Sequence, residues 1–189
     1  MDRGKIRILM FSLLVLLFTG VPAFMVFRYQ DVLANGTRYR FRCEPVDPSD
    51  AFRGKYVQLR FSQQEVEHSD TNSDFKTGQS VYAYLRVDSA GYAHVSKISV
   101  LGNSQNDNFS TKIEYVSTYS GTRIYFPFER YYMNEKTAPM AEKAYRHEAR
   151  IDSVYLDVRV YHGKAVTEEL YMNGMPVREY LEKLPVSDN

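Results

Sequence analysis

The chain has 189 residues, of which 44% are hydrophobic and 25% are charged, and its formal net charge is +1. These fractions are those of a folded domain with accessory segments, and they exclude a largely disordered chain. The near-neutral charge argues against a nucleic-acid binder, which needs a basic surface to displace counterions. With 16 Tyr and 11 Phe the chain is rich in aromatic residues, which favour β-strands.

The N-terminal part of the chain has the composition of a membrane anchor. Residues 1–7 form a basic stub, and residues 8–27 contain no charged side chain. Such a run has the length that an α-helix needs to cross about 30 Å of hydrocarbon. Pro22 lies in its last third, where a kink or an early end of the helix is tolerated. Because three basic residues precede the run and Arg28 alone follows closely, the positive-inside rule predicts a single-pass inner-membrane protein with a cytoplasmic N-terminus and a periplasmic C-terminal domain.

A cleaved signal peptide is the alternative for this segment, since it also starts with a basic region. The uncharged run is longer than the core of a signal peptide, and Gly20-Val21-Pro22 is a poor cleavage sequence because proline ends it. We therefore expect an uncleaved anchor over residues 8–27, a linker over residues 28–36 and an extracytoplasmic domain over residues 37–189.

This domain shows the alternation of apolar and polar side chains that is typical of half-buried strands. Two β-rich runs around Ser120-Gly121 predict a hairpin. Two more runs around His162-Gly163 predict a second hairpin, and a tight turn at Asn173-Gly174 follows it. A change of phase between Val95 and Ile98 indicates either a β-bulge or two short strands.

One amphipathic helix interrupts the strands. Asn134 or Thr137 is its candidate N-cap, and Pro139 lies near its first turn. Its predicted packing face holds Met140, Ala141, Ala144 and Tyr145. Residues 177–183 predict a short closing helix. We expect a mainly β fold, with a β-rich α+β arrangement as the alternative: one N-terminal transmembrane helix and a single β-sandwich or open-barrel-like domain with one amphipathic helix.

The sequence contains no catalytic or metal-binding motif. It lacks the G-x-S-x-G, phosphate-loop, H-E-x-x-H and C-x-x-C patterns, and its four histidines are scattered. Cys43 is the single cysteine, so no intramolecular disulfide forms, and we expect it to be buried in a strand. We therefore expect no enzymatic activity, no cofactor and no metal.

Several tyrosines lie on the polar faces of predicted strands, where they either bind a glycan or a protein partner or are covered by the helix or loops. They are Tyr56, Tyr82, Tyr84, Tyr155 and Tyr161. A second candidate is the segment FPFERYYMNE over residues 126–135. In a structural role, Arg130 pairs with a nearby acid. In a functional role, a ligand is bound jointly by Glu129, Arg130 and either Asp47 or Arg53.

The stretch GKYVQLRF, Gly54 to Phe61, resembles the motif that names the GDYXXLXY protein family, a bacterial family of no established function. Gly54, Tyr56 and Leu59 match, whereas Lys55 replaces the Asp and Phe61 replaces the last Tyr. The preceding Asp47-Pro48, Asp50 and Arg53 look like the family's lead-in, and ERYYMNE is similar to its second recurring segment. Alternation places Tyr56 and Leu59 on opposite faces, which favours a central strand between two layers.

The resemblance implies a membrane-anchored bacterial protein of unknown activity, and family members are often encoded beside, or fused to, multi-spanning membrane proteins. We therefore expect an accessory or interaction domain that binds such a partner. The alternative is an envelope-acting hydrolase or transferase with Glu129, Asp47 or Asp50 as acid or base. Lys55 rules out catalysis by a carboxylate at that position. The candidate binding residues are Asp47, Asp50, Arg53, Tyr56, Tyr82, Tyr84, Glu129 and Arg130.

Overall fold

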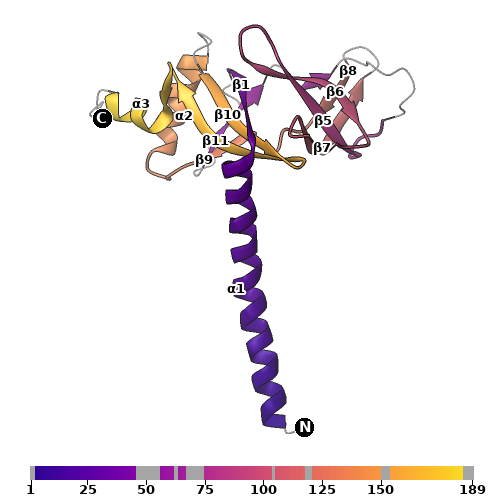
Figure 1. Cartoon of the computed structure of the whole chain (residues 1–189). Coiled ribbons are helices and arrows are strands. Elements are labelled where there is room, and N and C mark those ends of the chain that lie inside the picture. Colours follow the sequence, from indigo (N-terminus) through magenta and orange to yellow (C-terminus); the bar gives the residue numbers. More distant parts are fainter. Residues whose placement is uncertain are drawn as a thin grey trace.

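The fold is β-rich, and a long N-terminal helix projects from it (Figure 1). The computed structural model describes residues 3–45, 56–61, 64–66, 75–103, 105–117, 121–149 and 154–184. In chain order the elements are α1 (Arg3–Asn35), β1 (Thr37–Glu44), β2 (Tyr56–Gln58), β3 (Arg60–Phe61), β4 (Glu65–Val66), β5 (Ser80–Val87), β6 (Ala93–Ser99), β7 (Asn108–Ser117), β8 (Gly121–Ile124), β9 (Arg130–Tyr132), α2 (Ala138–Glu148), β10 (Val154–Tyr161), β11 (Lys164–Met172), β12 (Met175–Pro176) and α3 (Val177–Lys183).

The helix α1 is long and apolar enough to cross a membrane. It continues through Pro22 and through the residues that the sequence assigns to a linker, so that Gly36 alone separates α1 from β1. Two features explain the extension: residues 28–35 contain neither glycine nor proline, and Val32 is buried against the domain. A side chain at Gly36 would collide with the carbonyl oxygen of Val32, at 2.4 Å from its Cβ, so glycine permits this abrupt change from helix to strand.

The strands form two five-stranded sheets, in the orders β12-β11-β10-β1-β3 and β4-β8-β7-β5-β6, and a two-stranded ribbon of β2 and β9. The predicted hairpins are confirmed as β7–β8 and β10–β11. His162-Gly163 and Asn173-Gly174 form the tight turns after β10 and β11, each with two positive φ angles as a type I′ turn requires. The predicted bulge is also confirmed, because Tyr84 pairs with Lys97 and Leu85 pairs with Val95.

Both sheets share one core, which confirms the single β-rich domain. Its centre is a cluster of phenylalanine rings, in which the centroids of contacting rings lie 4.9 to 6.0 Å apart: Phe41, Phe61, Phe109, Phe126 and Phe128. The backbone N–H of Ser110 donates to the carbonyl of Gly163 at 2.8 Å and joins the two sheets beside this cluster. Such edge-to-face and tilted ring pairs add to the stability that burial of the rings provides.

The helix α2 covers one side of the core and begins after Thr137, one of the two predicted N-caps. Ala141, Ala144 and Tyr145 are buried as predicted, whereas Met140 is exposed, so its place in the packing face was wrong. The buried stripe of α2 runs from Ala138 through Ala141 and Tyr145, and Met140 lies beside it on the solvent side. α3 has the predicted bounds.

Cys43 is fully buried on β1, opposite Phe61, as predicted. Burial raises the pKa of its thiol far above the ordinary value, because the interior disfavours the thiolate. The thiol is therefore an inert core group in the folded chain.

Candidate functional site

The two segments that carry the family resemblance lie side by side in the fold. β2 contains the Tyr-Val-Gln of the first segment, β9 contains the Arg-Tyr-Tyr of the second, and the two strands pair antiparallel. The backbone N–H of Leu59 also donates to the carbonyl of Glu129 at 2.8 Å. The predicted faces are confirmed, since Val57, Leu59 and Phe61 are buried. The prediction of a central strand was wrong, because β2 pairs with β9 alone and β3 pairs with β1 alone among the described strands.

The outer face of this ribbon gathers two tyrosines and an arginine. Tyr56 lies directly opposite Tyr132, with ring centroids 5.6 Å apart, and Arg130 lies opposite Gln58. The guanidinium carbon of Arg130 lies 5.1 Å from the centroid of the Tyr56 ring, a cation–π contact. Tyr132 is 65% exposed. We call Tyr56, Arg130 and Tyr132 the motif surface.

Glu129 turns away from Arg130 and into the domain. Its Oε1 accepts hydrogen bonds from Gln64 Nε2 at 2.5 Å and from the backbone N–H of Phe126 at 3.1 Å. Arg123 donates to Gln64 Oε1 at 2.8 Å and extends this chain of contacts toward Glu114. Burial raises the pKa of Glu129, and its two hydrogen bonds oppose that rise. An oxygen that accepts two internal hydrogen bonds has the environment of a structural carboxylate.

The remaining candidate residues do not join the motif surface. Tyr82 and Tyr84 lie on β5 in the other sheet, where Tyr82 packs beside Gly102 and Tyr84 donates to the carbonyl of Leu101 at 2.9 Å. The tyrosines that alternation places on polar faces are therefore divided among different sheets rather than gathered on one. Asp47, Asp50 and Arg53 lie outside the described residues.

A cavity of about 490 Å³ begins where β9 ends, between α2 and α3. Met133, Met140 and Leu181 supply apolar walls, and Arg178 and Glu182 line it as well. Since Met133 follows Tyr132 directly, the cavity and the motif surface are adjacent along the chain. Within the described part of the chain, no group of three His, Cys, Asp or Glu side chains is placed to hold a metal ion.

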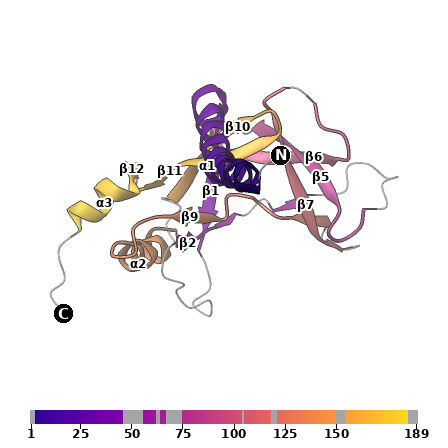
Figure 2. The same cartoon turned by 90° about the horizontal axis from the view of Figure 1, so that it is seen from below.

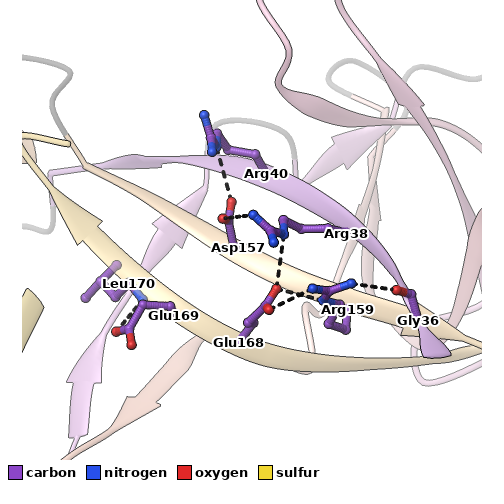
Figure 3. Close-up of polar contacts among 8 residues, drawn as sticks. All are labelled: Gly36, Arg38, Arg40, Asp157, Arg159, Glu168, Glu169 and Leu170. Atoms are coloured by element: carbon purple, nitrogen blue, oxygen red, sulfur yellow. Dashed lines mark hydrogen bonds and ion pairs between the residues drawn. The ribbon is translucent and has the colours of Figure 1, made fainter. Parts of the chain in front are cut away.

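A row of charged residues that the sequence analysis missed crosses the sheet of β1, β10 and β11 (Figure 3). Arg40 Nε donates to Asp157 Oδ1 at 3.2 Å, and Arg38 Nη1 lies 3.7 Å from Asp157 Oδ2. Arg159 donates to both oxygens of Glu168, at 2.8 and 2.9 Å. We call these five residues the arginine row. The alternation of arginines in TRYRFRCE was the available signal for it, since residues two apart share a strand face.

These features define a β-rich domain carried on a helix of membrane-spanning length, with an aromatic and cationic surface built by two paired motif segments. The family model described as GDYXXLXY protein matches residues 18–170, which include both segments, so the chain belongs to the GDYXXLXY protein family. No curated protein and no solved structure matches the chain.

Proposed function

We propose that this protein is a membrane-anchored, non-enzymatic interaction domain that binds a multi-spanning membrane protein through its motif surface. The observation that supports the proposal most is the pairing of β2 with β9, which brings Tyr56, Arg130 and Tyr132 together at the surface. Tyrosine and arginine are the residue types that dominate binding energy at protein interfaces. The adjacent cavity with its methionine walls offers a place for an apolar side chain of the partner.

The partner meets the domain outside the cytoplasm in this proposal, with α1 spanning the inner membrane as an uncleaved anchor. The excess of basic residues before the uncharged run supports this orientation. Single cysteines introduced as Lys5→Cys or Tyr125→Cys, each with Cys43→Ala, test it with a membrane-impermeant maleimide on spheroplasts. We expect labelling at position 125, whose side chain is exposed, and none at position 5. Labelling at position 5 alone would reverse the orientation, and a shortened chain in the soluble fraction would show cleavage.

Binding through the motif surface is tested with a photocrosslinking amino acid at position 132 of the full-length protein in its native membrane. Position 125 is the matched control, because Tyr125 is also an exposed tyrosine but follows β8 in the other sheet. We expect position 132, and not position 125, to capture a multi-spanning membrane protein that mass spectrometry identifies.

Arg130→Ala in the same chain should reduce this capture about five- to tenfold, the effect of losing about 1–1.4 kcal/mol at an interface. Arg130 is exposed, so the domain itself should remain folded. Equal capture at positions 132 and 125, or capture that Arg130→Ala leaves unchanged, would contradict the proposed surface.

A further inference from the structure

The cavity between α2 and α3 is an open groove with an apolar wall from each helix. The two helices contact each other, and seen from below they lie to one side of α1, with β5 to β7 on the other (Figure 2). Leu181 on α3 is buried, whereas Met140 on α2 is 42% exposed. Sites that bind ligands have volumes of about 300–1,000 Å³ and apolar walls with a few placed polar groups. With about 490 Å³, the groove has the size of such a site.

One face of α3 lines the groove with a cation, an apolar side chain and an anion. Arg178, Leu181 and Glu182 have the spacing i, i+3 and i+4, which places them on the same face of a helix. Arg178 and Glu182 are both exposed. Because they are four residues apart, they are separated by about 6 Å along the helix axis. The groove thus presents one positive and one negative group, one helical turn apart, beside its apolar wall.

The two charges that line the groove are not paired with each other, although a neighbouring pair on the same helix is. Lys183 Nζ lies 2.7 Å from Glu179 Oε1, which is also four residues away. Among the residues that the structure describes, Arg178 and Glu182 form neither an ion pair nor a side-chain hydrogen bond. An acid that precedes a base by one turn pairs better than the reverse order, because the helix dipole favours the base toward the C-terminus. Arg178 and Glu182 therefore remain available to charged groups of a ligand.

The oxygen atoms of the polar side chains at the start of α2 are engaged within the chain. Asn134 Oδ1 accepts a hydrogen bond from the backbone N–H of Lys136 at 3.0 Å. The hydroxyl group of Thr137 donates to the carbonyl of Asn134 at 3.1 Å. Both side chains line the groove, but they serve to form the turn that leads into α2. Recognition of charge in the groove is therefore left to Arg178 and Glu182.

We propose that the groove binds a helical segment of the membrane-protein partner, in which an acidic and a basic residue lie one turn apart and flank an apolar side chain. The acid pairs with Arg178, the base pairs with Glu182, and the apolar side chain enters between Met140 and Leu181. Side chains one turn apart on a helix are separated by about 5–6 Å, which matches the two charges on α3. The groove continues the motif surface beyond Tyr132, which favours a protein segment over a free small molecule. This inference rests on the proposed function, because it names the part of the partner that the groove binds.

The test uses a photocrosslinking amino acid at position 140 of the full-length protein in its native membrane, because Met140 is exposed and lines the groove. Mass spectrometry of the crosslinked peptide should identify a partner segment with an acid and a base three or four residues apart beside an apolar residue. The main variant exchanges the two charges of the groove, Arg178→Glu together with Glu182→Arg, and so keeps the net charge. We expect capture at position 140 to fall about tenfold, because like charges then face each other.

The matched control exchanges the neighbouring pair, Glu179→Lys together with Lys183→Glu, which does not line the groove. It should capture the partner as well as the wild type does. All four residues are exposed, so both exchanges should leave the urea midpoint within the range of surface substitutions. Exchange of the acid and the base in the mapped partner segment should restore capture by the groove variant.

Three results would overturn the proposed groove: capture that the exchange in the groove leaves unchanged, a crosslink from position 140 to this chain or to a second copy of it, and no crosslinked protein at all. A parallel crosslink at position 132 separates this failure from that of the proposed function. Capture of the partner at position 132 without capture at position 140 overturns the groove alone. Charge-dependent capture at position 140 without capture at position 132 overturns the motif surface alone, and no capture at either position overturns both.

Discussion

The ion pair between Arg40 and Asp157 leads to an asymmetric prediction about stability. Asp157 is buried, whereas Arg40 reaches solvent. Arg40→Gln leaves a buried carboxylate with Arg38 as its remaining cation, at 3.7 Å. Removing one partner of a fully buried pair costs about 3–5 kcal/mol, and because Arg38 remains near, we expect a loss of about 2–3 kcal/mol in the free energy of unfolding.

Asp157→Asn should cost less, although it removes the more buried residue. The amide oxygen of asparagine can still accept a hydrogen bond from Arg40, and the two arginines that lose a counter-charge are both partly exposed to water. The buried charge and its cost of desolvation disappear together. We therefore expect a change of about 0–1 kcal/mol for Asp157→Asn, well below that of Arg40→Gln.

Urea denaturation of the full-length protein in detergent measures this difference. Near-ultraviolet circular dichroism of tyrosine suits the purpose, because the chain has 16 Tyr and no Trp, and within α1 only Tyr29 contributes. The variants and the wild type must have equal m-values, so that a shift in the urea midpoint reports a change in the free energy of unfolding. Arg86→Gln is the surface control and should stay within about 0.5 kcal/mol of the wild type. If Asp157→Asn proves as costly as Arg40→Gln, the charge of Asp157 stabilises the fold, and the reasoning is refuted.

Three further predictions concern single side chains at or near the core. Burial raises the pKa of Glu129 in the folded chain, so its contribution to stability is complete below the ordinary carboxyl pKa of about 4.3 and is lost as the pH rises through the folded pKa. Glu129→Gln should therefore gain stability relative to the wild type as the pH rises from about 4 in urea titrations, and a constant difference would contradict this. Tyr145→Phe should lose about 1–3 kcal/mol in the same assay, because the hydroxyl group donates to the carbonyl of Glu44 and accepts from the N–H of Arg60; an unchanged midpoint would count against it. Cys43 should resist a membrane-permeant maleimide until urea unfolds the domain, and reaction in the native state would show that it is not buried.

Local signals in the sequence predicted those elements whose partners are close along the chain. The hairpins were predictable because His162-Gly163 and Asn173-Gly174 have the turn chemistry that positive φ angles demand. The end of α1 was not predictable in this way, because Arg28, the first charged residue after the uncharged run, suggested that the helix ends there. Helices end at a breaker or where packing stops, and the first breaker after the uncharged run is Gly36.

The surfaces were harder to predict than the elements, because they depend on strands that are distant in sequence. Alternation identifies the face on which Tyr56 or Tyr82 lies, but it does not identify the sheet to which that face belongs. The arginine row shows the same limit. Three alternating arginines on β1 were visible in the sequence. Their acidic partners were not, because Asp157, which pairs with Arg40, and Glu168, which pairs with Arg38, come from strands more than a hundred residues away.

The connection between α1 and the domain fixes the position of the motif surface relative to the membrane-spanning helix. A flexible linker would let the domain sample many heights and orientations above the membrane. Here one glycine separates helix from strand, Val32 is buried, and Tyr29 is hydrogen-bonded to β11. A tilt of α1 therefore moves the whole domain. In the proposed function, the motif surface is therefore presented at a defined height to a partner in the same membrane.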